Sequence, residues 1–210
     1  MASGALLIVA YTALFAVTHS ILAGIRVKTF ARRRFGTATD RWYRLGFVLI
    51  SLVEMLPIAY ILIYMPGRIL YQISPPWSWL MVTGQLLAAL GVLVALMQTG
   101  VSQFLGLSQT SGGQPLVGRR PGQPEKLVTN GLYCHLRNPL FTFGTAFIWL
   151  TPFMTTTLLA LYIVITIYFY LGSKHEEKLL IAEFGSEYEN YRRQVPAFLP
   201  RLRCASATSN

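Results

Sequence analysis

The sequence predicts an all-α integral membrane protein with about five transmembrane helices. Hydrophobic residues make up 53% of the 210 residues and charged residues only 12%, and the mean hydropathy is +0.47. A chain with so few polar side chains cannot cover a water-soluble fold. Several of its uncharged segments reach the roughly 20 helical residues that cross a bilayer. We expect one membrane domain over residues 1–210.

The first three spans are predicted over residues 5–25, 42–65 and 77–98. The first and third carry no charged residue, and Glu54 is the only acid in the second. No basic residue precedes the first apolar stretch, and no convincing small-residue cleavage site follows it. We therefore expect this stretch to be a retained span and not a signal peptide.

The next apolar stretch, from Leu140 to Leu171, is uncharged but too long for one crossing. Pro152 interrupts it near the middle, because proline removes a helical hydrogen bond. This predicts a tight helical hairpin with spans over residues 139–151 and 154–172. Asn138 followed by Pro139 is typical of a helix start, with the asparagine side chain as N-cap.

Polar segments lie before and after the hairpin. Residues 99–138 contain two Gly/Pro-rich runs and are expected to form a long mobile loop. Residues 173–210 are expected to form a C-terminal amphipathic helix and tail. Either a capping box starts that helix at Ser173, or the last span continues without a break. Its apolar stripe is formed by Phe184, Tyr188, Tyr191 and Val195, with Pro196 as the stop.

The basic residues predict the orientation. They gather between the first two spans, in the loop 99–138 and after the hairpin, whereas Arg68 lies elsewhere. Five spans place these three regions on one side, whereas four spans would split them. The positive-inside rule then predicts an N-terminus outside and a C-terminus in the cytoplasm. We expect a multi-pass protein of the bacterial inner membrane.

The net charge of +10 also bears on partners. The cations flank membrane segments and lack the aromatic interleaving of a nucleic-acid surface, so anionic lipid head groups are the expected partner and nucleic acid is not. Cys134 and Cys204 both fall on the predicted cytoplasmic side, where thiols stay reduced. No disulfide is therefore expected. The oligomeric state is left open by the sequence.

Two clusters at the ends of the hairpin carry the candidate chemistry. Arg137 precedes its first helix, and Glu176 and Glu177 follow its second. A short connection within the bilayer brings these charges together. A helix N-terminus and a guanidinium can bind a carboxylate, and two glutamates can hold an ammonium group or ribose hydroxyls. This suits a zwitterionic nucleoside cofactor; the alternative is a salt bridge that only anchors the hairpin.

Further candidates lie within the predicted spans. Glu54 is costly in lipid and is therefore either functional or a protonated partner of a neighbouring helix. His19, near the cytoplasmic end of the first span, either contacts substrate or bonds across helices. The three histidines and two cysteines show no metal-binding spacing, and no glycine-rich phosphate-binding motif occurs. No metal site is expected.

Both clusters belong to longer patterns that resemble a known family. The first is Gly131-x-Tyr133-x-x-x-Arg137-Asn138-Pro139-Leu140-Phe141, and the second runs from Glu176-Glu177 through Glu183-Phe184-Gly185 to Val195-Pro196 and Pro200. Together they resemble the isoprenylcysteine carboxyl methyltransferase family of integral membrane methyltransferases. Upstream, His19-Ser20 and the segment Phe104 to Gln109 are similar to the branch that includes methanethiol S-methyltransferase and NnrU-like proteins.

The resemblance implies an S-adenosylmethionine-dependent methyl transfer at the cytoplasmic face. The acceptor would be small and lipophilic or lipid-like, with a thiol or carboxylate preferred. Arg137, Glu54 and His19 are the catalytic candidates. The expected cofactor-binding residues are Tyr133, His135, Arg137, Asn138, Pro139, Leu140, Glu176, Glu177 and Tyr188.

One position departs from the family pattern. The family usually has a histidine where this chain has Asn138, and asparagine does not titrate near neutrality. If the histidine only positions the cofactor, asparagine can replace it. If the histidine moves a proton, His135 is the available substitute. Two alternatives to a methyltransferase stay open: an NADPH-dependent sterol-type reductase, and a non-catalytic membrane protein with the same scaffold.

Overall fold

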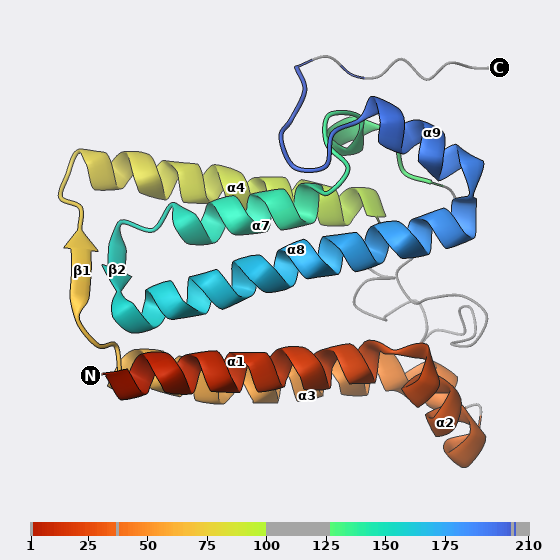
Figure 1. Cartoon of the computed structure of the whole chain (residues 1–210), viewed down its shortest axis with the longest axis horizontal. Coiled ribbons are helices and arrows are strands. Elements are labelled where there is room, and N and C mark those ends of the chain that lie inside the picture. The colour runs from red at the N-terminus through yellow and green to blue at the C-terminus, as the bar shows by residue number, and fades with distance from the viewer. Residues whose placement is uncertain (1, 37, 100–126, 203, 205–210) are drawn as a thin grey trace. The chain divides into compact units, whose positions relative to one another are not determined.

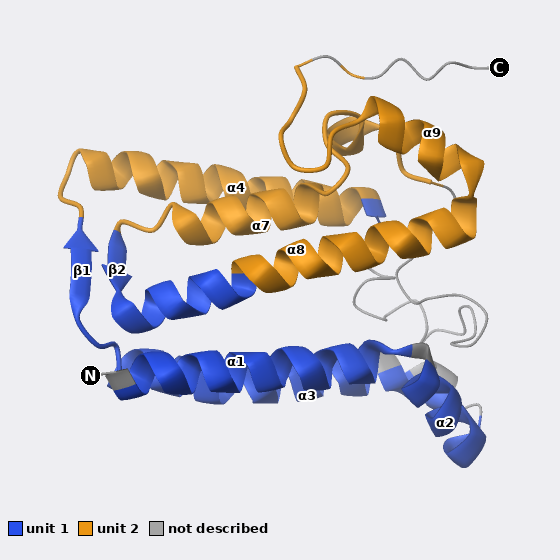
Figure 2. Ribbon diagram, viewed as in Figure 1, with its two compact units in different colours: residues 1–72, 99–123, 153–165 blue, residues 73–98, 124–152, 166–210 orange. Residues whose placement is uncertain are grey.

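The computed structural model describes residues 2–36, 38–99, 127–202 and 204, and helices dominate these residues (Figure 1). The two Gly/Pro-rich runs, and the segment Phe104 to Gln109, lie outside the described residues. The chain divides into two compact units (Figure 2). The first takes its described residues from Met1–Gln72, Thr99–Gln123 and Phe153–Ile165, and the second from Ile73–Gln98, Pro124–Pro152 and Thr166–Asn210.

The first unit is built on two long apolar helices, α1 (Ala2–Ala23) and α3 (Ala38–Tyr64), which pack against each other. Ile8 of α1 is fully buried and forms a core cluster with Ile61 of α3 and Leu161, which lies in the first part of α8 (Thr156–Phe184). Many of their other large apolar side chains are exposed, as on helices that face lipid rather than water. Both helices match the predicted spans.

A short helix that the sequence patterns do not reveal, α2 (Ile25–Phe35), connects α1 and α3. Glycines mark both of its ends: Gly24 is extended, and Gly36 has a φ of 67°, a conformation that suits glycine at a helix C-terminus. Three arginines occupy its last turn, where cations interact favourably with the helix dipole. The predicted basic connection is therefore helical.

Two short strands complete the first unit. β1 (Ile69–Gln72) pairs antiparallel with β2 (Phe153–Thr155), with Ile69 opposite Thr155. The Thr157 hydroxyl donates a hydrogen bond to the Met65 carbonyl at 2.7 Å. The predicted hairpin turn after Pro152 is thus a paired strand. The pairing satisfies backbone groups that an isolated turn would leave open.

The second unit contains α4 (Trp77–Thr99), a 3₁₀ turn η1 (Gly131–Cys134), α7 (Pro139–Trp149), the later part of α8, and α9 (Ser186–Gln194). The Gln85 amide donates to the Phe147 carbonyl, which joins α4 to α7. The Trp149 indole donates to the Thr166 hydroxyl at 2.9 Å, which joins α7 to α8. These contacts confirm that the two helices of the predicted hairpin lie side by side.

The last long helix does not stop at the predicted membrane boundary. α8 continues to Phe184, and the Ser173 hydroxyl donates to the Tyr170 carbonyl within the helix. The capping-box alternative at Ser173 is therefore wrong, and the uninterrupted alternative is correct. Serine in a helix interior commonly bonds back to an earlier carbonyl in this way.

Within the described residues, four helices are long and apolar enough to cross a membrane: Ser3–Ala23, Leu45–Tyr64, Trp77–Thr99 and Thr156–Phe184. α7 is also apolar but has 11 residues, which corresponds to about 16 Å of helix. The chain is therefore mostly helical with the features of a multi-pass membrane protein. The fifth span stays a prediction.

The packing of α4 against α7 predicts the effect of adding a methyl group at Gly91. A Cβ there would lie 2.6 Å from ring carbons of Phe143, whereas a Cβ at Gly46 in α3 would meet nothing within 4 Å. We expect Gly91→Ala to destabilise the chain by about 1–3 kcal/mol through overpacking. Gly46→Ala should be neutral or slightly stabilising. Thermal unfolding of both variants in detergent measures the contrast; equal effects would contradict the close α4–α7 packing.

Candidate cofactor site at the start of α7

A buried ion pair lies directly before α7. The Arg137 guanidinium donates from Nη1 to Oε1 of Glu177 in α8 at 2.7 Å, and the two side chains are only 9% and 5% exposed. The predicted juxtaposition of Arg137 with the paired glutamates is therefore confirmed for Glu177. Because both charges are largely desolvated, each depends on the other for stabilisation.

Further groups surround this pair. Arg137 Nε donates to the Val195 carbonyl at 2.8 Å. Besides burial, the charges of Glu177 and Arg137 both act on the pKa of the nearby Tyr188 hydroxyl. Asn138 Nδ2 donates to Glu177 Oε1 at 3.4 Å and to the Ala197 carbonyl at 3.3 Å. Tyr188 and Asn138 are themselves buried. The result is a polar network enclosed by protein, in which each hydrogen bond helps to fix the guanidinium.

The start of α7 differs from the prediction in one respect. Pro139 occupies the first turn of the helix, as the sequence predicts, but the Asn138 side chain makes no capping hydrogen bond. Its amide is turned toward Glu177 and Ala197 instead. The predicted N-cap hydrogen bond, which would use the side-chain oxygen, is therefore wrong. The side chain is oriented by its Nδ2 contacts with Glu177 and Ala197. The first-turn N–H groups of α7 are left without a side-chain acceptor at the cap position.

The chain after α9 closes over this region. Backbone N–H groups of Arg137 and Asn138 donate to the carbonyls of Pro196 and Ala197. Tyr188, Tyr191 and Val195 form a buried cluster, and its partly buried neighbours are Leu127, Leu180, Ile181 and Phe184. The predicted apolar stripe is thus confirmed as a packing surface. Phe184 is the last residue of α8, whereas Tyr188 and Tyr191 lie on α9, which begins after Gly185 with its φ of 53°. The stripe is therefore divided between two helices.

The remaining predicted cofactor residues lie around this network. Glu176 is exposed, beside the buried Glu177, and Lys174 Nζ is 3.6 Å from Glu177 Oε2. Leu140 is half-buried in the first turn of α7. The Tyr133 carbonyl accepts a hydrogen bond from the Tyr191 hydroxyl at 2.7 Å. The structure thus places these predicted residues within one region of the second unit.

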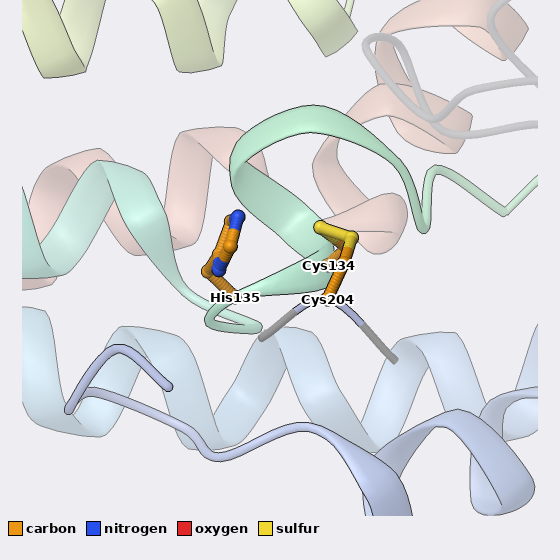
Figure 3. Close-up of side chains that lie close together, drawn as sticks. All are labelled: Cys134, His135 and Cys204. Atoms are coloured by element: carbon orange, nitrogen blue, oxygen red, sulfur yellow. A yellow bond between two sulfur atoms is a disulfide. The ribbon is translucent and has the colours of Figure 1, made fainter. Parts of the chain in front are cut away.

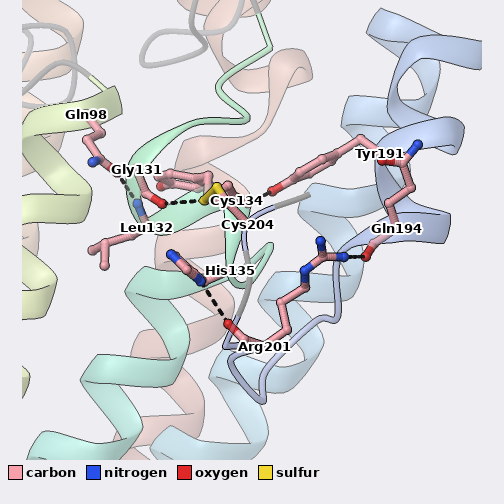
Figure 4. Close-up of a disulfide and its surroundings, with 10 residues drawn as sticks. Gln98, Gly131, Leu132, Cys134, His135, Tyr191, Gln194, Arg201 and Cys204 are labelled. Atoms are coloured by element: carbon pink, nitrogen blue, oxygen red, sulfur yellow. Dashed lines mark hydrogen bonds between the residues drawn. A yellow bond between two sulfur atoms is a disulfide. The ribbon is translucent and has the colours of Figure 1, made fainter. Parts of the chain in front are cut away.

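His135 and the two cysteines join the C-terminal tail to η1. Cys134 and Cys204 form a disulfide with a Cα–Cα distance of 5.0 Å (Figure 3). The expectation of unpaired cysteines is therefore wrong: it considered the compartment but not the return of the tail to η1. His135 Nδ1 is 2.8 Å from the Arg201 carbonyl, and the Arg201 N–H donates to the His135 carbonyl (Figure 4).

The two candidates from the predicted spans both lie in the first unit. His19 Nδ1 is 3.1 Å from the Ser51 hydroxyl, and its ring contacts Phe15 and Phe47. This is the cross-helix bond that the sequence allows as an alternative to substrate contact. Glu54 Oε1 accepts from the Thr18 hydroxyl at 3.1 Å, while Oε2 makes no hydrogen bond within the described residues.

The sequence patterns do not reveal the role of the segment after α9. Val195, Pro196, Ala197 and Arg201 act through backbone carbonyls, which accept from Arg137, Asn138 or His135. Every residue has a backbone carbonyl, so the residue type does not indicate which carbonyl accepts a hydrogen bond. The only available signal is the Val195-Pro196 pair at the end of the stripe, which indicates where helix gives way to extended chain.

The fold and the site together define a multi-pass helical membrane protein with a buried arginine–glutamate pair at one helix start. A profile of the family described as "Phospholipid methyltransferase" matches residues 79–187, which include Arg137, Glu176 and Glu177. The chain belongs to this methyltransferase family, as the resemblance in the sequence predicts.

Relatives of known name support the same assignment. The methanethiol S-methyltransferase of Crocosphaera subtropica is 29% identical over 89% of this chain and 71% of its own length. Methanethiol S-methyltransferase 1 of Bradyrhizobium diazoefficiens is 29% identical over 91% and 65%, so the chain spans slightly less than two thirds of it. The protein-S-isoprenylcysteine O-methyltransferase of Schizosaccharomyces pombe is 31% identical over half of each chain. No solved structure matches the chain.

The buried pair predicts a large energetic coupling. We expect Glu177→Gln to leave the Arg137 charge unpaired and to cost about 3 kcal/mol of stability. Glu183→Gln, at an exposed position on the same helix, should cost almost nothing. In the double variant Arg137→Gln/Glu177→Gln the loss should be smaller than the sum of the single losses. Thermal unfolding in detergent measures these three variants and Arg137→Gln alone; additive losses would show that the pair is not coupled.

The tyrosines of α9 predict a loss of stability in alkali. Burial, followed by the nearby Glu177 carboxylate, raises the pKa of the Tyr188 hydroxyl. Burial, followed by Tyr188, raises the pKa of Tyr191 well above its usual value. A raised folded-state pKa means that stability is intact below the unfolded pKa of about 10 and falls as the pH rises above it.

Tyr191→Phe tests the contribution of this hydroxyl. The substitution removes the hydrogen bond to the Tyr133 carbonyl and should cost about 1 kcal/mol near neutral pH. It should also reduce the decline in stability above pH 10, because the group that must ionise is absent. Unfolding curves across this range compare the variant with the natural chain. An unchanged alkaline decline would mean that Tyr191 does not contribute to it.

Proposed function

We propose that this chain transfers a methyl group from S-adenosylmethionine to a small lipophilic thiol at the cytoplasmic face of a membrane. The observation that carries the proposal is the buried Arg137–Glu177 pair at the start of α7, within the part of the chain that matches the methyltransferase family. Relatives named methanethiol S-methyltransferase align with most of this chain. The names of these relatives favour a thiol acceptor over a carboxylate acceptor, a choice that the sequence leaves open.

The residues around the pair suit the charged groups of this cofactor. A guanidinium with five N–H donors, held rigidly by Glu177 and the Val195 carbonyl, offers donors for a carboxylate. The first turn of α7 has no side-chain cap, so its backbone N–H groups add further donors for an anionic group. The exposed Glu176 supplies a carboxylate for an ammonium group or ribose hydroxyls. Asn138 holds Glu177 in place by a hydrogen bond.

Methyl transfer from a sulfonium does not require strong acid–base catalysis. When bound, S-adenosylmethionine supplies a methyl group on a positively charged sulfur. A thiolate acceptor forms the new sulfur–carbon bond as the old one breaks, and the thiol proton leaves to water. The protein must then align the two sulfurs and exclude water. Arg137 is suited to binding the cofactor and not to moving a proton.

The membrane face and the lipid partner are part of the same proposal. The basic residues of α2, which include Arg32, Arg33 and Arg34 in its last turn, fit the cytoplasmic side under the positive-inside rule. The same residues fit anionic head groups. A small lipophilic thiol partitions into the bilayer and would reach the site from the lipid side.

Binding of S-adenosylhomocysteine to the purified chain tests the cofactor. We expect micromolar affinity by calorimetry, and Glu176→Gln should weaken it about 10-fold or more through loss of a charged hydrogen bond. Glu176 is exposed, so its substitution should leave the melting temperature unchanged. The matched control is Glu183→Gln, which should bind normally. Binding of NADPH instead would identify a reductase, and binding of neither would identify a non-catalytic protein; both results overturn the proposal.

The acceptor is tested with isotopically labelled S-adenosylmethionine. The reconstituted chain should convert methanethiol or another small thiol into the methyl thioether, detected by mass spectrometry. An isoprenylated cysteine carboxylate and a phospholipid amine are the competing acceptors. Label in either of these and not in the thioether would contradict the proposed acceptor while leaving the cofactor assignment intact.

A further inference from the structure

Three soft or borderline metal donors meet where the tail contacts η1. One ring nitrogen of His135 and the sulfurs of Cys134 and Cys204 all lie within 4.8 Å of one another (Figure 3). The two cysteines are 70 residues apart in the chain, so their spacing shows no metal-binding pattern. The fold therefore creates a donor set that the sequence analysis excludes. Sulfur and imidazole nitrogen are the donors that zinc prefers in proteins.

The hydrogen bonds of His135 prepare its ring for a metal. Nδ1 lies 2.8 Å from the Arg201 carbonyl, and a carbonyl oxygen only accepts hydrogen bonds. Nδ1 therefore carries the proton, and in the neutral ring Nε2 keeps a free electron pair. Histidine ligands of metals are typically oriented in this way, with the second ring nitrogen donating to a carbonyl or carboxylate.

We propose that the reduced chain binds one zinc ion through Cys134 Sγ, His135 Nε2 and Cys204 Sγ, with water in the fourth position. Zinc–sulfur bonds of about 2.3 Å and zinc–nitrogen bonds of about 2.0 Å place neighbouring ligand atoms roughly 3.5 Å apart. In the structure, one His135 ring nitrogen and both sulfurs lie within 4.8 Å of one another, so metal binding requires rotation of these side chains to bring the three ligand atoms to that separation. Because Cys204 is exposed, the ion can enter from solvent.

The metal form and the disulfide form exclude each other. A thiol or phosphine reductant supplies two electrons, and two protons complete the thiols as the sulfur–sulfur bond breaks. Zinc then displaces both thiol protons as two zinc–sulfur bonds form. In a reducing compartment, where disulfides are rare, the zinc form would keep the tail attached to η1. This attachment lies two residues before Arg137 in the chain, next to the residues proposed to hold the cofactor.

Cobalt substitution tests the site in the full chain. After phosphine reduction in detergent, cobalt should bind one ion per chain and show thiolate charge-transfer absorption with the visible bands of a tetrahedral site. Zinc should displace it. The same chain, left oxidised, should show neither signal. This comparison involves no substitution, so a folding defect cannot explain the difference.

Variants assign the ligands. Cys134→Ser and Cys204→Ser should each remove most of the thiolate absorption. His135→Ala should weaken zinc binding at least 10-fold. Loss of a residue that only hydrogen-bonds to a metal ligand already costs about 10-fold or more in affinity, and loss of a ligand should cost no less. His175→Ala, on α8, is the matched control and should bind normally. Absence of cobalt binding by the reduced chain, equal binding by the oxidised chain, or persistence in the double cysteine variant would each overturn the proposal. Because the readout is metal binding, the result is independent of methyl transfer.

Discussion

The candidate site depends on one buried ion pair, between Arg137 and Glu177. Neither charge is stable alone at such low exposure, so the helix that carries Glu177 and the segment that carries Arg137 are held together by desolvated electrostatics. Asn138 and the Val195 carbonyl then orient the charges by hydrogen bonds. The anchoring role and the proposed cofactor role are compatible. The guanidinium has more donors than the pair uses, and Glu176 stays exposed beside it.

The pair is in turn enclosed by backbone from a distant part of the chain. Arg137 and Asn138 donate their N–H groups to Pro196 and Ala197, and His135 exchanges contacts with Arg201. The disulfide between Cys134 and Cys204 adds a covalent link to the same arrangement. These contacts position a segment that has no regular secondary structure. Its carbonyl groups accept hydrogen bonds from the N–H groups of Arg137 and Asn138, and buried N–H groups require such acceptors.

Sequence reasoning predicts the long helices and the meeting of Arg137 with Glu177, because hydropathy and the length of a bilayer crossing determine both. It does not predict the β1–β2 pairing, since strands of three and four residues leave no distinct periodic signal. It also misses α2, although this short helix between two glycines is amphipathic. The disulfide is missed for a different reason. The reducing compartment predicted for both cysteines argues against a disulfide. The closeness of Cys134 and Cys204 depends on the return of the tail to η1, which cannot be predicted from their spacing in the sequence.

The structure also bears on the residue that departs from the family pattern. Asn138 is buried, and its amide donates to both the Glu177 carboxylate and the Ala197 carbonyl. Both contacts need a hydrogen-bond donor, and neither needs a group that gains or loses a proton. A histidine ring at this position could also donate to one of these oxygens. The work of position 138 is therefore to hold the glutamate and the closing segment, which asparagine does without titrating. The departure from histidine is thus compatible with the contacts that hold Glu177 and the closing segment.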